Sequence, residues 1–418
     1  LALLLLMRIG SRATRSVAVA ICAAAAFASW RSSLMVASDA MLEFPALLFT
    51  LAAILVLANL DRFDWRRAVL FGALAGLAVW TKQHAVFLVA LPLVFLVLAR
   101  RFAMLRTAVP WIALISAGLP VVALHWFSSV YRGAGTDQVV RSYAIADTIL
   151  HHLRYYAAAT SEVLGWPLTV AVAVILLYSL VRCLQGRAGD GTALLVSWFL
   201  CAFAVLLLIG PYDPRYLFFG YPALALLVFA TIREVACEVA GARWAWTAPT
   251  AVAVLCTVWG LAATPLNYLT GPEQAAAEVL AAGGPSQRVL YCGSTDGNFI
   301  FSLRSGGGRE SAVILGEKLT DAMRQPAALA SFAELYGVSR VVIETSVRPQ
   351  ACEAIAVNPP PSFALERRVP LDSSVPRWKN GSLTVYRVNT SGQARANRLL
   401  LPIPKVGGFV QADLSTRP

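Results

Sequence analysis

The chain has 418 residues, of which 58% are hydrophobic and only 14% are charged, and its mean hydropathy is +0.65. A soluble domain carries about 25% charged residues, and a single soluble core stops growing near ~250–300 residues, so a water-soluble fold would not bury this much apolar side chain. The formal net charge of +12 does not indicate a nucleic-acid partner, because most of the excess Lys and Arg lies between apolar segments in residues 1–266, where it sets membrane topology.

The N-terminal residues 1–7 read Leu-Ala-Leu-Leu-Leu-Leu-Met. No charged region precedes them and no small-residue cleavage site follows, so they do not fit a secretory signal peptide. We expect them to be the stub of an apolar helix, with an N-terminal piece missing from the sequence.

After the stub, the chain contains nine apolar segments that reach or approach the ~20 residues needed to span a membrane. They lie at 14–30, 41–60, 68–81, 84–99, 107–127, 164–181, 191–210, 216–232 and 245–264. The predicted fold class is a polytopic α-helical membrane protein of about nine spans plus the stub, with a C-terminal extracytoplasmic α/β domain.

The basic residues between these segments predict the orientation. If the stub ends inside, the inner loops carry 13 Lys and Arg and the outer loops carry six, as expected from the enrichment of these residues in cytoplasmic loops. The chain has 31 Arg and four Lys, which hints at a GC-rich bacterial genome. We therefore expect a multi-pass protein of the bacterial cytoplasmic (inner) membrane, with everything after residue 266 outside.

Two segments, 68–81 and 84–99, are short for spanning helices and flank Lys82. Short spans predict an outer cleft in which irregular backbone and charge are tolerated. Gly72 and Gly76 form a GxxxG step that would let a neighbouring helix approach closely.

A long outer loop occupies residues 128–163. Its stretch 138–160 has apolar residues at helical spacing, which predicts an interfacial amphipathic helix. Long loops are often functional, and we expect this one to cover an outward-facing cleft.

From Asn267 the sequence changes character. Short apolar runs predict strands, and they alternate with helical patterns, which is typical of a small α/β domain with a largely parallel sheet. The predicted strands are 289–291, 312–315, 340–343 and 383–386, and the predicted helices are 272–282 and 327–336.

The predicted organisation is therefore a transmembrane domain at 1–266, N-terminally incomplete, an extracytoplasmic α/β domain at 267–390, and a poorly ordered tail at 391–418. Cys292 and Cys352 both fall in the outer domain, where an oxidising compartment permits a disulfide. The sequence leaves open whether the two cysteines pair.

Ionisable residues at the outer helix ends are the functional candidates, because charges near a bilayer are costly. They are Asp39, Glu43, Lys82, Asp213 and Arg215, all at the same predicted depth. Lys82 suits a phosphate oxygen, and Arg215 can hold a phosphate or carboxylate bidentately.

Structural interpretations stay open for the same residues. Asp39 would cap the following helix, Lys82 would extend to the membrane interface, and Asp213 would pair with Arg215 in a proline-rich turn. His84 has no partner at metal-ligand spacing, and His151 and His152 are adjacent. No cofactor is therefore certain, and a divalent metal ion beside the acids remains an open alternative.

Three passages around these residues resemble motifs of the GT-C membrane glycosyltransferases, in the bacterial branch of protein mannosyltransferases and lipid A aminoarabinose transferases. AMLEFPAL at 40–47 is similar to the second acidic motif of the family, GALAGLAVWTK at 72–82 to its glycine-rich helix ending in lysine, and DPRYLFFGYP at 213–222 to its Arg-Tyr helix start. The resemblance covers roughly residues 1–265.

The resemblance implies inverting transfer of a hexose or pentose from a polyprenyl-phosphate-linked donor to an envelope acceptor, whether lipid, glycan or protein, on the extracytoplasmic face. Glu43 and Asp39 are the catalytic candidates: Glu43 would correspond to the second acid, which orients the acceptor or an associated metal. Lys82 and Arg215 would stabilise the departing phosphate. Candidates for acceptor or lid contacts are His84, Asp213, Tyr216 and Arg154. Membrane lipids are the other expected partners.

The family's first acidic motif, which usually supplies the general base, lies in an outer loop that this sequence would begin after. Two alternatives to an enzyme follow from other observations. A catalytically incomplete scaffold or sugar-binding relative would fit the missing motif. A membrane transporter would show paired, broken helices in two corresponding halves, and the sequence shows no internal repeat.

Overall fold

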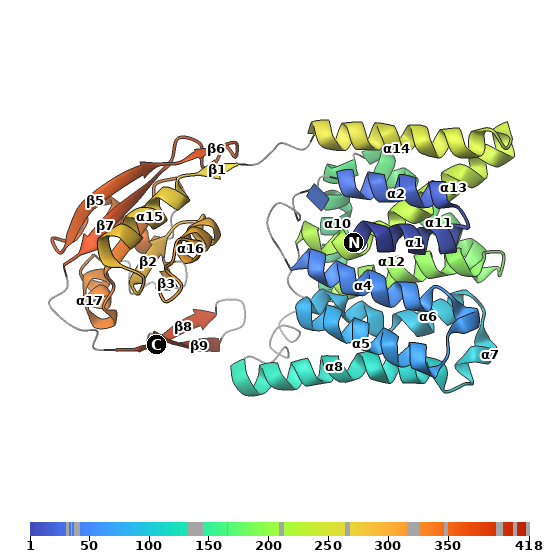
Figure 1. Ribbon diagram of the computed structural model, residues 1–418, viewed down its shortest axis with the longest axis horizontal. Helices are drawn as coiled ribbons and strands as arrows, with labels where there is room; N and C mark the ends of the chain where they lie inside the picture. Colours follow the sequence, from blue (N-terminus) through green and yellow to red (C-terminus); the bar gives the residue numbers. More distant parts are fainter. Residues whose placement is uncertain are drawn as a thin grey trace. The chain divides into compact units, whose positions relative to one another are not determined.

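A computed structural model describes residues 1–30, 33–34, 36, 42–132, 145–164, 166–208, 213–263, 268–316, 319, 326–346, 350–389, 396–403 and 408–414. These residues divide into two compact units (Figure 1). The first covers 1–131 and 145–263 and is helical, and the second begins at 268 and contains the β-sheets.

The helical unit is a bundle whose helices run back and forth between its two ends (Figure 1). Its α-helices are α1 Ala2–Thr14, α2 Val17–Ser29, α4 Glu43–Leu57, α5 Trp65–Thr81, α6 Leu91–Leu98, α7 Phe102–Leu105, α8 Val109–Arg132, α10 Ile145–Leu164, α11 Trp166–Leu184, α12 Asp190–Leu208, α13 Tyr221–Ala240 and α14 Trp244–Ala263, and its 3-10 helices are η1 Leu60–Arg62, η2 Gln83–Val89 and η3 Pro214–Phe219. Each of the nine predicted segments coincides with one of these helices or with a 3-10 helix and the α-helix after it.

Apolar side chains also cover the outside of the bundle. Leu119 and Val122 on α8, Leu177 on α11 and Leu255 and Trp259 on α14 are all exposed, which water would not tolerate over so large a surface. By length and composition, three of the described helices can cross a membrane: Val109–Phe127, Asp190–Leu208 and Trp244–Ala262. The bundle is thus that of a membrane protein, and the count of nine spans stays a prediction.

Helix α1 extends beyond the predicted stub at 1–7. It continues to Thr14 because the polar residues after Met7 still keep an amphipathic spacing, with Leu6 and Ile9 buried and Arg12 exposed. An apolar run alone therefore underestimated its length.

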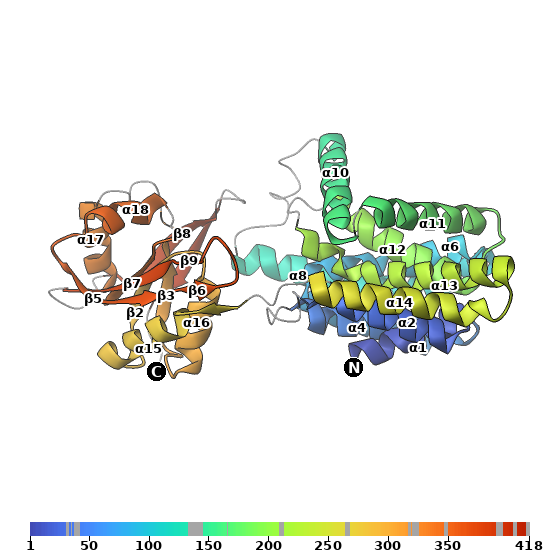
Figure 2. The same ribbon diagram turned by 90° about the horizontal axis from the view of Figure 1, so that it is seen from above.

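Helix α10 realises most of the helix predicted at 138–160, and residues 133–144 lie outside the described part. In Figure 2 it stands crosswise to the other helices, at the end of the bundle where α4 begins. Its interfacial position stays a prediction.

The GxxxG step on α5 packs against α8. A Cβ atom added at Gly72 would overlap Ser116, and one at Gly76 would lie 2.6 Å from Pro120 Cγ. The Ser116 hydroxyl donates a hydrogen bond to the Ala68 carbonyl across the same contact (3.2 Å). The missing side chains therefore allow the two helices to touch.

Gly72→Ala should lower the free energy of unfolding by about 1–3 kcal/mol, because the new methyl group has no space between α5 and α8. Gly118→Ala is the matched control, since a Cβ at Gly118 meets nothing within 4 Å and alanine favours a helix by up to about 1 kcal/mol. Thermal unfolding in detergent compares the two variants. Equal unfolding temperatures would contradict the close packing at Gly72.

The second unit is built on a five-stranded sheet in the order β3-β2-β4-β7-β5. Its strands are β2 Arg288–Cys292, β3 Ala312–Leu315, β4 Arg340–Glu344, β5 Phe363–Pro370 and β7 Ser382–Val388, and its helices are α15 Pro272–Gly283, α16 Asp296–Ser305, α17 Pro326–Tyr336 and α18 Gln350–Val357. The short strands β1 Leu269–Thr270 and β6 Asp372–Ser373 pair separately.

The sheet is parallel only over β3-β2-β4, whereas β7 pairs antiparallel with both β4 and β5. The prediction of a largely parallel sheet is therefore wrong for the β4-β7-β5 part of the sheet. The reason is the connection: β7 follows β5 through a short segment that includes β6, and a parallel neighbour needs a crossover of a dozen or more residues, usually a helix.

The tail at 391–418 was predicted to be poorly ordered, and this is wrong for residues 398–403 and 408–413, which form strands. Strands β8 Arg398–Ile403 and β9 Gly408–Asp413 form an antiparallel pair. Leu399 and Leu414 are buried in the same apolar cluster as Leu290 and Val341 of the main sheet. The burial of a few apolar side chains thus orders this segment although it is rich in Pro, Gly and Arg.

Cys292 at the end of β2 and Cys352 in α18 form a disulfide, with Cα atoms 6.0 Å apart. This answers the pairing that the sequence left open, because the parallel strand β2 and the helix after β4 bring two segments 60 residues apart together.

Replacing both Cys292 and Cys352 with alanine should lower the free energy of unfolding of this unit by about 2–5 kcal/mol, because the unfolded chain gains freedom. The change is measured by unfolding the protein in urea, with limited proteolysis as the readout of the unfolded fraction. The exposed free cysteine Cys237, changed to alanine, is the control and should have no effect; an equal effect of both changes would contradict a stabilising disulfide.

Candidate active site

Glu43 is the first residue of α4, yet its side chain is only 1% exposed. The helix N-terminus carries partial positive charge and favours a carboxylate there. The next residue, Phe44, packs edge-to-face on Phe218 of η3, with ring centroids 5.1 Å apart. Helix α4 therefore presents an acid directly beside the 213–219 segment.

Lys82 forms an ion pair with Glu43, with its Nζ 2.7 Å from Oε1. Helix α5 ends at Thr81, Lys82 takes an extended conformation, and the 3-10 helix η2 begins at Gln83. This irregular backbone, which the short segments predicted, turns the lysine towards α4. The buried Glu43 carboxylate holds the lysine ammonium group, and the Lys82 side chain stays 23% exposed.

The aromatic ring of Tyr216 in η3 is contacted by several of the other candidate residues. His84 stacks on it, with ring centroids 3.7 Å apart and an interplanar angle of 26°. The Lys82 ammonium and the Arg215 guanidinium both lie 5.7 Å from its centroid. Three segments far apart in the sequence therefore come together here.

Arg215 also pairs with Asp213, with Nε 3.0 Å from Oδ2, and the Arg215 backbone N–H donates a hydrogen bond to Asp213 Oδ1 (3.0 Å). The proposed structural turn therefore exists. It does not remove Arg215 from the site, because the arginine side chain is 38% exposed and lies over Tyr216.

The positive and negative charges of this group are paired, Lys82 with Glu43 and Arg215 with Asp213. Each cation has a carboxylate beside it, which offsets part of the cost of holding charge near the bilayer. The two ring nitrogens of His84 are buried and have no hydrogen-bond partner among the described residues. Such groups are usually satisfied by a partner, so this imidazole is available to a bound molecule.

Arg154 on α10 is exposed and is not brought into this group. Asp39 lies outside the described residues, so its part in the site stays a prediction. On α10 the inward residues are instead His152, whose Nδ1 lies 3.0 Å from the Leu206 carbonyl, and Tyr156, which lies beside the Asp213 backbone. Their spacing of four residues on an amphipathic helix was the signal for an inward face.

The described residues contain no group of three or more His, Cys, Asp or Glu side chains that would hold a metal ion. Glu43 is engaged by Lys82 and Asp213 by Arg215.

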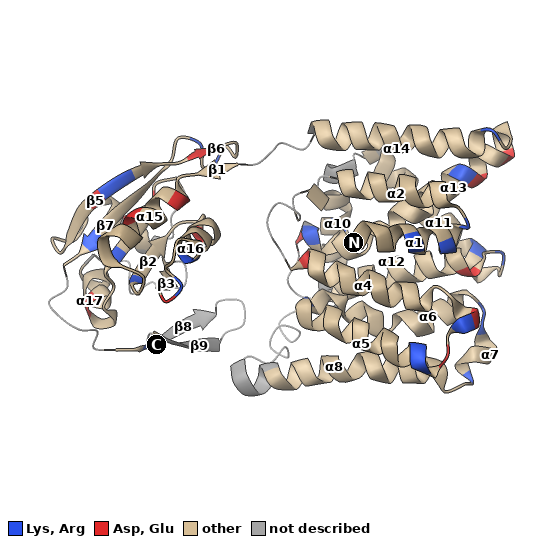
Figure 3. Ribbon diagram, viewed as in Figure 1, with Lys and Arg blue, Asp and Glu red and all other residues tan. Residues whose placement is uncertain are grey.

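Figure 3 shows the charges of the helical unit gathered at its two ends. The end where α4 begins carries a small mixed group of basic and acidic residues, and most Lys and Arg lie at the other end. The helical bundle therefore has apolar walls and a compact group of charged residues at the end where α4 begins.

No family model matches the chain, and no curated protein matches it by sequence. Among solved structures, the chain is similar to the crystal structure of ArnT from Cupriavidus metallidurans bound to undecaprenyl phosphate, with a TM-score of 0.52 and 15% sequence identity. The match covers 94% of this chain and 83% of that one. The expected GT-C membrane fold is thereby confirmed.

Proposed function

We propose that this chain is a glycosyltransferase that moves a sugar from a polyprenyl-phosphate-linked donor to an envelope acceptor on the extracytoplasmic face of the membrane. The observation that carries the proposal is the convergence of Lys82 and Arg215 on Tyr216, beside the buried carboxylate of Glu43. Two cations at the edge of an apolar bundle suit a phosphate attached to a lipid tail. The ArnT structure with undecaprenyl phosphate supports the same class of donor.

The chemistry follows from where charge develops. The acceptor hydroxyl attacks the anomeric carbon from the face opposite the phosphate, the sugar–phosphate C–O bond breaks, and its electron pair stays on the phosphate. Lys82 and Arg215 stabilise that growing negative charge. As Lys82 turns to the phosphate, its contact with Glu43 loosens.

Glu43 then orients the acceptor hydroxyl through a hydrogen bond and is placed to take its proton. Asp39 is the other candidate for this role. His84, stacked on Tyr216, would donate a hydrogen bond to the sugar or the acceptor.

Two observations support the extracytoplasmic face. Most basic residues of the bundle lie at the end opposite Glu43 (Figure 3), as expected for the cytoplasmic side. The disulfide between Cys292 and Cys352 suits an oxidising compartment. On this basis we place the second unit outside the cytoplasmic membrane as well.

The test is mass spectrometry of envelope glycans and glycolipids in a strain that lacks the gene. We expect one sugar to disappear from a lipid, glycan or protein, and the purified full-length protein to restore it when given the polyprenyl-phosphate-linked donor. Unchanged envelope glycans together with no transfer in vitro would exclude the enzyme and favour a scaffold role.

A further inference from the structure

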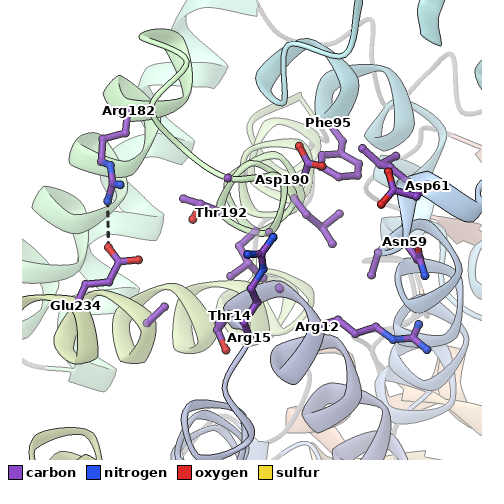
Figure 4. A pocket seen from close by; sticks show the side chains of 18 of the residues that line it. Arg12, Thr14, Arg15, Asn59, Asp61, Phe95, Arg182, Asp190, Thr192 and Glu234 are labelled. Atoms are coloured by element: carbon purple, nitrogen blue, oxygen red, sulfur yellow. Dashed lines mark hydrogen bonds and ion pairs between the residues drawn. The ribbon is translucent and has the colours of Figure 1, made fainter. Parts of the chain in front are cut away.

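A pocket of about 520 Å³ opens at the end of the helical bundle away from Glu43. Glu43 is the first residue of α4, whereas the pocket is lined by Ala58 and Asn59, which follow its last residue. The ends of α1 and α4, the start of α12 and the middle of α13 surround it (Figure 4). It is therefore separate from the site described above.

Positive charge dominates this pocket. Its charged lining residues are Arg12, Arg15, Arg182, Arg233, Asp61, Asp190 and Glu234. Two of the acids are neutralised: Glu234 by Arg182 at 3.0 Å, and Asp190 by Arg101, which is not part of the lining, at 2.7 Å. Three arginines therefore remain against one aspartate.

The three remaining arginines are oriented without being neutralised. Arg12 donates a hydrogen bond to the Leu55 carbonyl (3.3 Å) and Arg233 to the Thr14 carbonyl (3.4 Å). Arg15 forms no ion pair with a described residue, and its side chain extends into the middle of the lining side chains (Figure 4). Backbone carbonyls hold the first two in place while their charge stays available.

Arg15 also occupies an unusual backbone conformation. It ends α1 with φ 51° and ψ 32°, the left-handed region that glycine or asparagine usually fills at this position. A residue with a Cβ atom is strained in this conformation. The side chain is thus directed into the pocket at a conformational cost.

The first turn of α12 forms another wall. Gly191 has no side chain, and a Cβ atom there would overlap the Ala13 carbonyl, so α12 begins directly against the end of α1. Thr192 of the same turn lines the pocket. The N-terminus of this 19-residue helix adds its positive end to the arginines.

The basic surface continues onto an apolar one. A second pocket of about 210 Å³ shares Arg12 and Asn59 with the first and is also lined by Arg62 and Arg67. Its other residues are Leu55, Val56 and Leu70, of which Leu70 is 50% exposed. A soluble anion would make no favourable contact with this apolar edge, whereas the acyl chain of a phospholipid would pack against it.

We propose that this pocket binds the phosphate-bearing head group of an anionic phospholipid, with an acyl chain against Leu55, Val56 and Leu70. Basic pockets between helices at the cytoplasmic side of a membrane suit anionic head groups, with about 1 kcal/mol for each Lys or Arg near the surface. The proposed topology places the pocket on that side. The site is independent of the transfer reaction.

The test is native mass spectrometry of the whole chain in detergent with phosphatidylglycerol or phosphatidylcholine of identical acyl chains. We expect one tightly retained phosphatidylglycerol and at least a tenfold preference over phosphatidylcholine. Equal retention of both lipids would overturn the proposal. Displacement by soluble glycerol phosphate at the same concentration would overturn it in favour of a soluble anion.

Arg15→Gly is the decisive variant, because glycine suits the left-handed conformation and the fold should be at least as stable. We expect the preference for phosphatidylglycerol to fall by about fivefold or more, since about 1 kcal/mol corresponds to that ratio. Arg106→Gly makes the same change at the same end on an exposed arginine outside the pocket and should keep the preference. An equal loss in both variants, or none in Arg15→Gly, would overturn the assignment to this pocket.

Discussion

Replacing Glu43 with glutamine should lower sugar transfer by the full-length protein by about 10²–10⁴-fold, the contribution of a well-placed proton acceptor. Glutamine keeps the size of the side chain, so the packing of Phe44 on Phe218 stays intact. What is lost is the negative charge that orients the acceptor hydroxyl and balances Lys82. Transfer from a polyprenyl-phosphate-linked donor in proteoliposomes measures the effect.

Glu278→Gln is the matched control for this change. Glu278 also forms an ion pair, with Arg367 at 2.5 Å, but in the second unit. Its variant should transfer sugar at the wild-type rate. If the Glu43→Gln variant transfers sugar at the wild-type rate, Glu43 is not part of the proposed site, whatever the Lys82 variant shows.

Replacing Lys82 with methionine should both lower sugar transfer and weaken the fold. Transfer should fall by about 10²–10³-fold, because a positive charge no longer meets the departing phosphate. Stability should fall by about 3–5 kcal/mol, since Glu43 is buried and loses its ion-pair partner. Thermal unfolding in detergent separates the second effect from the first.

The double variant Glu43→Gln/Lys82→Met distinguishes a structural ion pair from a catalytic one. Removing both charges leaves no buried charge without a partner, so the unfolding temperature should return close to that of the wild type while transfer stays lost. Arg367→Met, which breaks the exposed pair with Glu278, should change neither quantity. A double variant as unstable as Lys82→Met would contradict the pairing, and one that transfers sugar would contradict the proposed site.

Several features of the fold were readable from the sequence because their causes are local. Apolar length and helical spacing placed α2, α4, α8 and α14 close to their observed bounds. Runs of β-branched and apolar residues likewise located the core strand Arg340–Glu344. Irregular backbone after Lys82 followed from two segments too short for regular spans.

Other features required the tertiary structure. The helix α16 and the strand β5 were missed because Asp296–Ser305 and Phe363–Pro370 carry many polar residues and only weak periodicity. The antiparallel direction of β7 and the ordered β8–β9 pair depend on contacts with distant strands. The same holds for the disulfide, since no spacing along the chain determines which cysteines meet.

For the candidate site, the amino-acid sequence by itself determined the kind of residue and its place at a helix end: Glu43, Lys82 and Arg215 lie where only a functional or structural reason keeps charge near lipid. Only the tertiary structure decided that Lys82 turns inward to Glu43, that His84 stacks on Tyr216, and that Tyr156 rather than Arg154 faces the bundle. The physical reason is that depth follows from hydrophobic length along one helix, whereas pairing depends on the rotation of helices about their axes, which the packing of the whole bundle sets.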